Sequence, residues 1–192
     1  MPNHCSNYLK IVVSNGHEDY FDDLVKAIQE ERLFEFITPV PECLKDVIAG
    51  GYGDSNEQAA LEKRYAENIA ECGYANWYQF CVAEWGTKWD LYGLDLTYDR
   101  DALWIDLHFN TAWAPPTKIY WAMESLEQIE TFKAYYFEPG CSFCGVHTPE
   151  HEEEYTIEKF TVDWVYENIP EAIIEHTGMY EIVAECEEYD EG

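Results

Sequence analysis

The order of apolar and polar positions at the start of the chain predicts a strand followed by an amphipathic helix. Residues 5–14 (CSNYLKIVVS) are apolar and rich in β-branched side chains, and the turn sequence Asn15-Gly16 ends them. Over residues 18–32, apolar side chains recur at helical spacing, and acidic residues occupy the first turn, where the helix dipole favours them. The chain therefore opens with a strand and a helix that buries one face.

The next residues predict an insert that is mostly helical. Residues 34–40 (FEFITPV) favour a short extended segment, because prolines lie within it and just after it. Residues 56–72 are rich in helix formers, and residues 76–84 place large apolar side chains on one helical face. We therefore expect residues 34–87 to be an insert in which two helices follow an extended piece.

A β-hairpin, a helix and a last strand follow this insert. Residues 88–98 and 102–109 alternate in polarity on either side of a tight polar turn. Pro115-Pro116 ends the second of these strands and opens a helix, and residues 132–137 form the last strand. Without the insert the order is β-α-β-β-α-β. The sequence therefore predicts an α+β fold of the ferredoxin-like type, a split βαβ arrangement with an antiparallel sheet and the helices on one face.

The C-terminal segment differs from the rest in composition. Residues 150–192 contain 15 acidic residues and a single lysine. They keep apolar positions, and residues 162–176 predict a helix that Pro170 kinks or restarts. We expect residues 1–149 to form the ferredoxin-like domain. We expect the acidic segment to form a helical extension that docks on this domain and frays over residues 185–192.

The imbalance of charge limits the partners that the protein can bind. The 192 residues include 39 acidic and 11 basic ones, a formal net charge of −28, and half of it lies in residues 150–192. A surface with this much negative charge repels phosphate backbones and anionic lipids. We therefore expect no direct binding to nucleic acid or to membranes. Basic proteins and metal cations are favoured instead. Solubility at high salt is a second explanation for the acidity, and the oligomeric state stays open.

Apolar stretches and cysteines indicate the compartment. No stretch approaches 18 consecutive apolar residues, and the N-terminal sequence MPNHCSN has no basic region or apolar core of a signal peptide. The chain has seven cysteines, an odd number, which we interpret as mostly free thiols rather than a disulfide framework. We therefore expect a protein that stays in the reducing cytoplasm in which it is made.

Four short motifs occur along the first three quarters of the chain. They are residues 1–7 (MPNHCSN), 76–89 (with NWY and WGTKW), 109–116 (FNTAWAPP) and 136–145 (with YFEPG and FCG). In this order they resemble the YubB-like family of phage and plasmid proteins, and the resemblance covers about residues 1–147. It implies a ferredoxin-like domain and an origin in a mobile element. It implies no reaction and no catalytic residues.

Aromatic residues gather at the predicted junctions of strands and helices. They belong to the WGTKW run of residues 85–89, to Trp113 and to the adjacent prolines. Aromatic platforms of this kind stack nucleic-acid bases or hold cations. The alternative is that these side chains close one end of the sheet.

Cys141 and Cys144 have the spacing of a zinc or redox pair, and His147 follows three residues later. A closed zinc site needs four ligands, and His4 and Cys5 are the further candidates if the first and last strands are neighbours. The alternative is that these thiols are structural. We otherwise expect no cofactor.

The acidic segment is the candidate binding surface. Duplex DNA carries one charge per roughly 1.7 Å, so a net charge of −28 corresponds to about 14 base pairs. We therefore expect a phage or plasmid accessory protein that mimics DNA and inhibits a nucleic-acid-binding defence complex of the host, of the CRISPR or restriction type. The alternatives are a non-enzymatic interaction module of a mobile element and a metal-dependent enzyme. The expected contact residues are Glu150, Glu152, Glu153, Glu154, Glu158, Asp163, Glu167, Glu171, Glu175, Glu181, Glu185, Glu187 and Glu188.

Overall fold

Six antiparallel strands form one sheet in the described part of the protein. The computed structural model describes residues 3–51 and 53–190. The strands pair in the order β2-β3-β1-β4-β5-β6, and every neighbouring pair is antiparallel. The protein therefore has an α+β fold. The strands are β1 (His4–Val13), β2 (Tyr92–Asp99), β3 (Trp104–Ala112), β4 (Ile129–Glu138), β5 (Phe143–Thr148) and β6 (His151–Thr156).

Alternation along the central strand β1 gives the sheet two buried faces. Leu9, Ile11 and Val13 point to one face and belong to the larger apolar core. Tyr8 points to the other face, where it joins a second apolar cluster. Successive side chains of a strand point to opposite faces of the sheet. A strand with apolar side chains on both faces is therefore buried only when other elements pack on both sides of the sheet.

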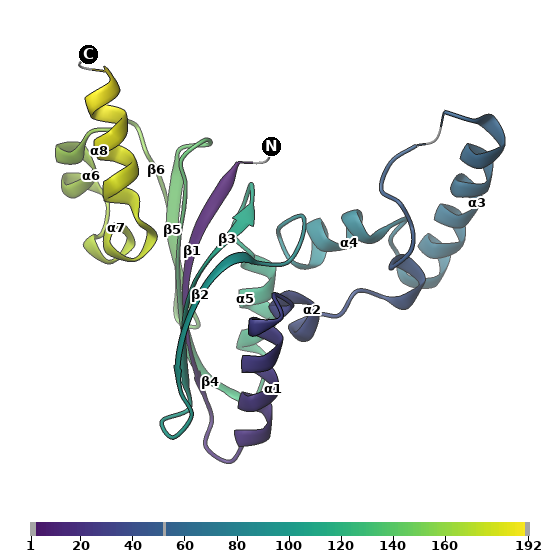
Figure 1. Cartoon of the computed structure of the whole chain (residues 1–192), viewed down its shortest axis with the longest axis horizontal. Helices are drawn as coiled ribbons and strands as arrows, with labels where there is room; N and C mark the ends of the chain where they lie inside the picture. Colours follow the sequence, from purple (N-terminus) through teal and green to yellow (C-terminus); the bar gives the residue numbers. More distant parts are fainter. Residues whose placement is uncertain (1–2, 52, 191–192) are drawn as a thin grey trace.

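Helices α1 (Glu18–Gln29) and α5 (Thr117–Glu124) lie on the face that carries the larger core (Figure 1). The α1 side chains Phe21, Leu24 and Ile28 are buried there, as their helical spacing predicts. Both helices were expected from the sequence and are confirmed, although α1 ends three residues earlier than predicted.

The C-terminal helices α6 (Val162–Asn168), α7 (Glu171–Thr177) and α8 (Met179–Asp190) lie on the opposite face (Figure 1). Pro170 separates α6 from α7, so the expected interruption at this proline is confirmed. The helices bury one apolar side each in the second cluster against β1 and β4. The buried side chains include Val165, Ile173, Ile174, Met179 and Val183.

The expected fraying of the chain from residue 185 is wrong for the described residues, because α8 continues to Asp190. A hydrogen bond connects the last turns of α8 to the start of α6. The carboxylate of Glu187 accepts it from the backbone N–H of Val162 at 3.0 Å. Residues 191 and 192 lie outside the described part.

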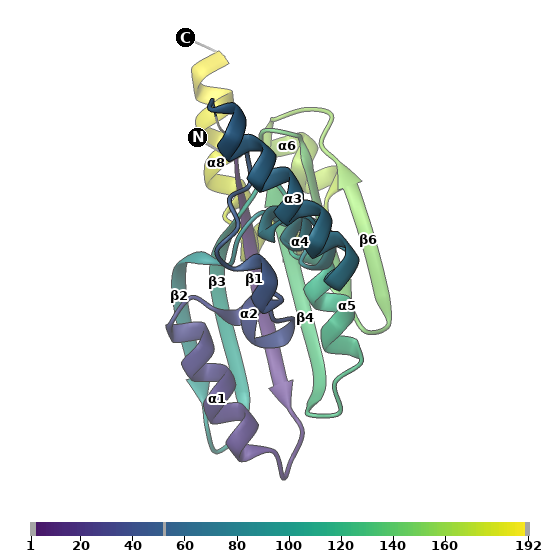
Figure 2. The same cartoon turned by 90° about the vertical axis from the view of Figure 1, so that its right-hand side faces the viewer.

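The insert consists of α2 (Leu33–Ile37), the short 3-10 helix η1 (Glu42–Leu44), α3 (Ser55–Cys72) and α4 (Trp77–Glu84). It lies on the side of α1 and α5, and α3 projects away from the sheet (Figures 1 and 2). Neither α3 nor another helix within residues 3–51 and 53–190 is both long and apolar enough to cross a membrane.

The expectation of an extended piece at residues 34–40 is wrong for its first half, which is helical in α2. The cause is a contact from another part of the chain. The carboxylate of Asp90 accepts hydrogen bonds from the backbone N–H groups of Phe34 (3.1 Å) and Glu35 (2.9 Å) and so caps the start of α2.

The expectation that residues 132–137 form the last strand is also wrong, because β5 and β6 extend the sheet beyond β4. The C-terminal segment is therefore not helical throughout. The expected boundary between residues 149 and 150 falls in the turn that joins these two strands. Strand β6 (HEEEYT) is almost entirely exposed, so it lacks the apolar alternation by which a strand is recognised in a sequence. Its consecutive glutamates also protect the free edge of the sheet from further pairing.

Candidate functional site

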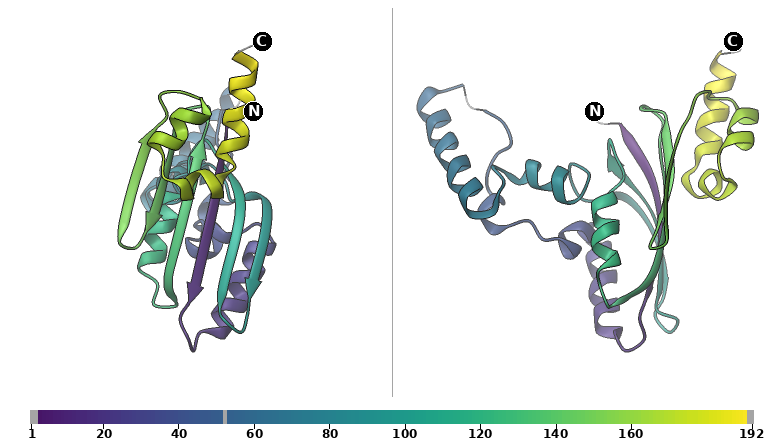
Figure 3. Two further views of the ribbon diagram at one scale, coloured as in Figure 1. Left: turned by 90° about the vertical axis from the view of Figure 1, so that its left-hand side faces the viewer. Right: turned by 180° about the vertical axis from the view of Figure 1, so that it is seen from behind.

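The thirteen acidic residues expected to bind a partner lie on the edge strand β6, on α6–α8 and in the loops beside them. Figure 3 shows this part of the chain, coloured light green to yellow, from two further sides. Twelve are exposed, and the thirteenth, Glu187, is half-buried. We call these thirteen residues the C-terminal acidic surface. Strand β6 contributes Glu152, Glu153 and Glu154, and the three helices contribute Asp163, Glu167, Glu171, Glu175, Glu181, Glu185, Glu187 and Glu188. The loops contribute Glu150 and Glu158.

Few basic side chains form ion pairs with the carboxylates of this surface. Within the described residues, every ion pair of a Lys or Arg with an Asp or Glu lies between residues 10 and 106. The carboxylates of the C-terminal acidic surface form ion-pair contacts with histidines only, Glu152 with His147 and Glu153 with His151. The negative charge of this surface is therefore not neutralised by neighbouring basic side chains.

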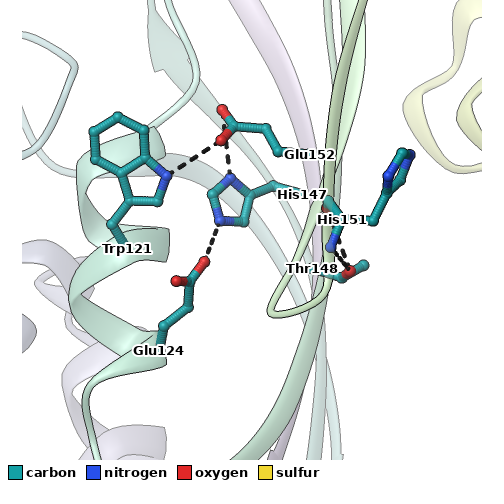
Figure 4. A network of polar contacts seen from close by, with 6 residues as sticks. All are labelled: Trp121, Glu124, His147, Thr148, His151 and Glu152. Carbon is teal, nitrogen blue, oxygen red and sulfur yellow. Dashed lines mark hydrogen bonds and ion pairs between the residues drawn. The ribbon is translucent and has the colours of Figure 1, made fainter.

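The imidazole of His147 lies between two carboxylates, from α5 and from β6 (Figure 4). Its Nε2 is 2.7 Å from Oε1 of Glu124, and its Nδ1 is 3.7 Å from Oε1 of Glu152. The indole N–H of Trp121 donates to the other oxygen of Glu152 at 3.3 Å. The His147 side chain is almost completely buried and packs against the ring of Tyr120. This network connects the neighbouring strands β5 and β6 to α5.

The network does not form a metal centre. The two nitrogens of an imidazole point in opposite directions, so Glu124 and Glu152 cannot join His147 around one ion. Only Nε2 is within hydrogen-bond distance of a carboxylate, that of Glu124, because the 3.7 Å from Nδ1 to Glu152 is too long for a hydrogen bond. The sequence gives no signal for this arrangement, because its members come from a helix and two different strands.

The five candidate metal ligands do not come together. Cys141 is exposed in the turn after β4, whereas Cys144 and His147 are buried on opposite faces of β5, as expected for strand residues three positions apart. His4 and Cys5 are adjacent on β1, which β4 separates from β5. In the described ranges, no three His, Cys, Asp or Glu side chains form a group suited to a metal ion.

The thiols of the Cys-x-x-Cys pair are also poor nucleophiles. Burial raises the pKa of Cys144 to about 12. A hydrogen bond to the carboxylate of Glu138 raises the pKa of Cys141. Because the thiolate is the reactive form, neither cysteine is poised for redox catalysis.

Similarity to known proteins does not assign a function to these residues. Comparisons with protein-family models, curated proteins and solved structures find no match. The function is therefore inferred from the charges and contacts of the chain itself.

The aromatic group divides into a buried part and an exposed part. Trp85 is buried, and its indole N–H donates to the backbone oxygen of Thr38 at 2.8 Å. Next to it, the Thr87 hydroxyl donates to the backbone oxygen of Ala112 at the end of β3. These contacts close one end of the sheet, whereas Trp113 is nearly half exposed (48%).

An open pocket of about 420 Å³ lies between the helices of the insert and the residues that precede β2. Trp77, Trp85 and Trp89 line it together with the carboxylates of Glu35 and Asp90. Burial raises the pKa of Asp90 to about 6, although hydrogen bonds from three backbone N–H groups lower it. Because these hydrogen bonds occupy Asp90, its role is to hold α2 in place. Arg32, Val40, Lys45 and Cys81 complete the lining.

Proposed function

We propose that the C-terminal acidic surface binds a positively charged, nucleic-acid-binding protein and occupies the groove in which that protein holds DNA. The observation that carries this proposal is the set of twelve exposed carboxylates without Lys or Arg ion pairs among the described residues. Because no Lys or Arg forms an ion pair with these carboxylates, they present a concentrated negative potential, and complementary potentials steer and speed association. The proposed activity is inhibition by DNA mimicry, without catalysis.

The size of the charge supports a partner with an extended basic groove. Residues 150–192 alone carry 15 acidic residues and one lysine, which corresponds to about 7 base pairs of duplex DNA. Charges at a protein surface act over roughly 8 Å at physiological ionic strength. The segment is therefore large enough to compete with DNA over part of a binding groove.

We also propose that β1–β4, α1 and α5 form a ferredoxin-like unit of mobile-element origin. The strand order β2-β3-β1-β4, with α1 and α5 on one face, supports this arrangement. The resemblance of four motifs within residues 1–147 to the YubB-like family supports a phage or plasmid origin. In such a setting, the partner is a CRISPR or restriction complex in the cytoplasm of the host cell.

Displacement of labelled duplex DNA from restriction endonucleases and CRISPR effector complexes tests the proposal. We expect the protein to displace DNA from such a complex. The apparent affinity should fall at least about tenfold between about 50 and about 200 mM salt, because the contact is electrostatic. A complex that binds DNA and this protein at the same time, or an affinity that does not depend on salt, contradicts the mimicry and indicates an interaction module of another kind.

A further inference from the structure

Two cysteines of the insert touch one another at the base of its projecting helix. The Sγ atoms of Cys43 on η1 and Cys72 at the end of α3 are 3.4 Å apart, although the residues are 29 positions apart in the sequence. Both side chains are half-buried. No other pair of cysteines within the described ranges has its sulfur atoms in contact.

Several contacts around the pair hold η1 and α3 together. The Arg64 guanidinium on α3 donates to the backbone oxygen of Cys43 at 3.3 Å. The Tyr65 hydroxyl donates to the backbone oxygen of Ile48 at 2.7 Å. Helix α3 then ends at Gly73, whose φ of +88° turns the chain back toward α4. The two thiols are therefore brought together by the fold of the insert rather than by their spacing in the chain.

We infer that Cys43 and Cys72 are a modification site, at which a small-molecule disulfide such as oxidised glutathione converts the two thiols into a protein disulfide. The bond would join η1 to the end of α3 and so fix the base of the projecting helix. A disulfide has an S–S distance of about 2.0 Å, so the two sulfur atoms, which are 3.4 Å apart, need to approach by about 1.4 Å. The site lies outside the C-terminal acidic surface, so this inference does not rest on the proposed function.

The oxidation proceeds in two exchange steps. One cysteine loses its proton and attacks a sulfur of oxidised glutathione, which forms a mixed disulfide and releases one glutathione thiolate that takes up a proton. The other cysteine then loses its proton, attacks the protein sulfur of the mixed disulfide and releases the second glutathione. Two protein thiols are oxidised, and one glutathione disulfide is reduced to two glutathione molecules.

The environment of the pair sets the pH dependence of this reaction. Desolvation and the neighbouring Cys72 thiol raise the pKa of Cys43, and the nearby carboxylate of Glu71 raises it further. The reactive thiolate is therefore scarce at neutral pH and increases as the pH rises. Formation of the disulfide should be faster at about pH 8 than at about pH 7.

Peptide mapping of the full-length protein tests the inference. Trypsin cleaves after Lys63 and Arg64, between the two cysteines, so a disulfide keeps both fragments joined until it is reduced. After treatment with oxidised glutathione and alkylation of the remaining thiols, we expect peptide 33–45 linked to peptide 65–88. Because the second peptide also contains Cys81, the link should persist in Cys81→Ser and be lost in Cys72→Ser.

The exposed Cys186 provides the internal control, because it should accept glutathione under the same conditions. If Cys186 is modified while Cys43 and Cys72 are recovered as separate alkylated or glutathione-bearing peptides, the inference is wrong. A link between peptide 33–45 and Cys81 would also overturn it.

Discussion

Asp90→Asn replaces an ionisable group that is half-buried at the start of α2. In the wild-type protein, Oδ1 accepts hydrogen bonds from the backbone N–H groups of Phe34 and Leu91, and Oδ2 accepts one from Glu35. Burial is the larger influence and raises the pKa of this carboxyl from 3.8 to about 6. The asparagine side chain has nearly the same shape but does not titrate.

The sign and size of the effect follow from this pKa. A folded-state pKa above the unfolded value means that the folded protein keeps the proton to higher pH. The stabilising contribution is complete below the unfolded-state pKa and is lost as the pH rises through about 6. A rise of about two units corresponds to about 3 kcal/mol. Between about pH 4 and about pH 7, the free energy of unfolding of the wild type should therefore fall by about 2 kcal/mol relative to Asp90→Asn, because the rest of the change lies below about pH 4.

Urea unfolding at a series of pH values, followed by tryptophan fluorescence, measures this difference. The other carboxylates titrate in both proteins, so their contribution cancels when the two free energies are subtracted. Asp46→Asn, at an exposed position of the insert, is the matched control and should show a difference from wild type that is nearly constant with pH. If the difference in the free energy of unfolding between wild type and Asp90→Asn is also constant with pH, the reasoning from the raised pKa of Asp90 is wrong.

Two further substitutions test the packing of the C-terminal segment and of its hairpin. Ile173→Ala empties a fully buried position of α7 and should lower the free energy of unfolding by roughly 2–5 kcal/mol, whereas Ile69→Ala, at an exposed position of α3, should have a much smaller effect. Equal effects in urea unfolding would mean that α7 does not pack on the sheet as described. Gly145→Ala should lower the melting temperature, because a Cβ there would lie 2.6 Å from the backbone oxygen of Glu153. Gly50→Ala, with no atom within 4 Å of its Cβ, is the control, and equal melting temperatures would contradict the close approach of β5 and β6.

Sequence patterns predicted the parts of the fold in which one face of an element is buried. The strands β1 and β3 and the helices α1 and α5 alternate or repeat in polarity because they face a core on one or both sides. The edge strand β6 has no buried face, and its three consecutive glutamates indicated a solvated segment rather than a strand. Helix α2 was missed because Asp90, 56 positions from Phe34, caps it.

The candidate sites depend even more on contacts between distant segments. The spacing of Cys141, Cys144 and His147 suggested a metal site, but a strand places the last two on opposite faces. The contact of Cys43 with Cys72 could not be foreseen, because cysteines 29 positions apart have no characteristic spacing. Twelve of the thirteen acidic residues are exposed, because a run of carboxylates has few alternatives to exposure, whereas their role as contact residues stays a prediction.

The most direct test of the central claim compares two variants that remove the same amount of charge. The first replaces one exposed glutamate on each element of the C-terminal acidic surface, and the second replaces four exposed glutamates of α3. Their substitutions are Glu154→Gln, Glu167→Gln, Glu175→Gln and Glu185→Gln in the first, and Glu57→Gln, Glu62→Gln, Glu67→Gln and Glu71→Gln in the second.

The measurement is the affinity of each variant for the nucleic-acid-binding protein from which the wild type displaces DNA. We predict that the first variant binds at least about tenfold more weakly and depends less on salt, because it loses charges at the contact, whereas the second binds nearly as the wild type does. Equal losses of affinity in the two variants would contradict a specific role of the C-terminal acidic surface and would indicate that only the net charge matters.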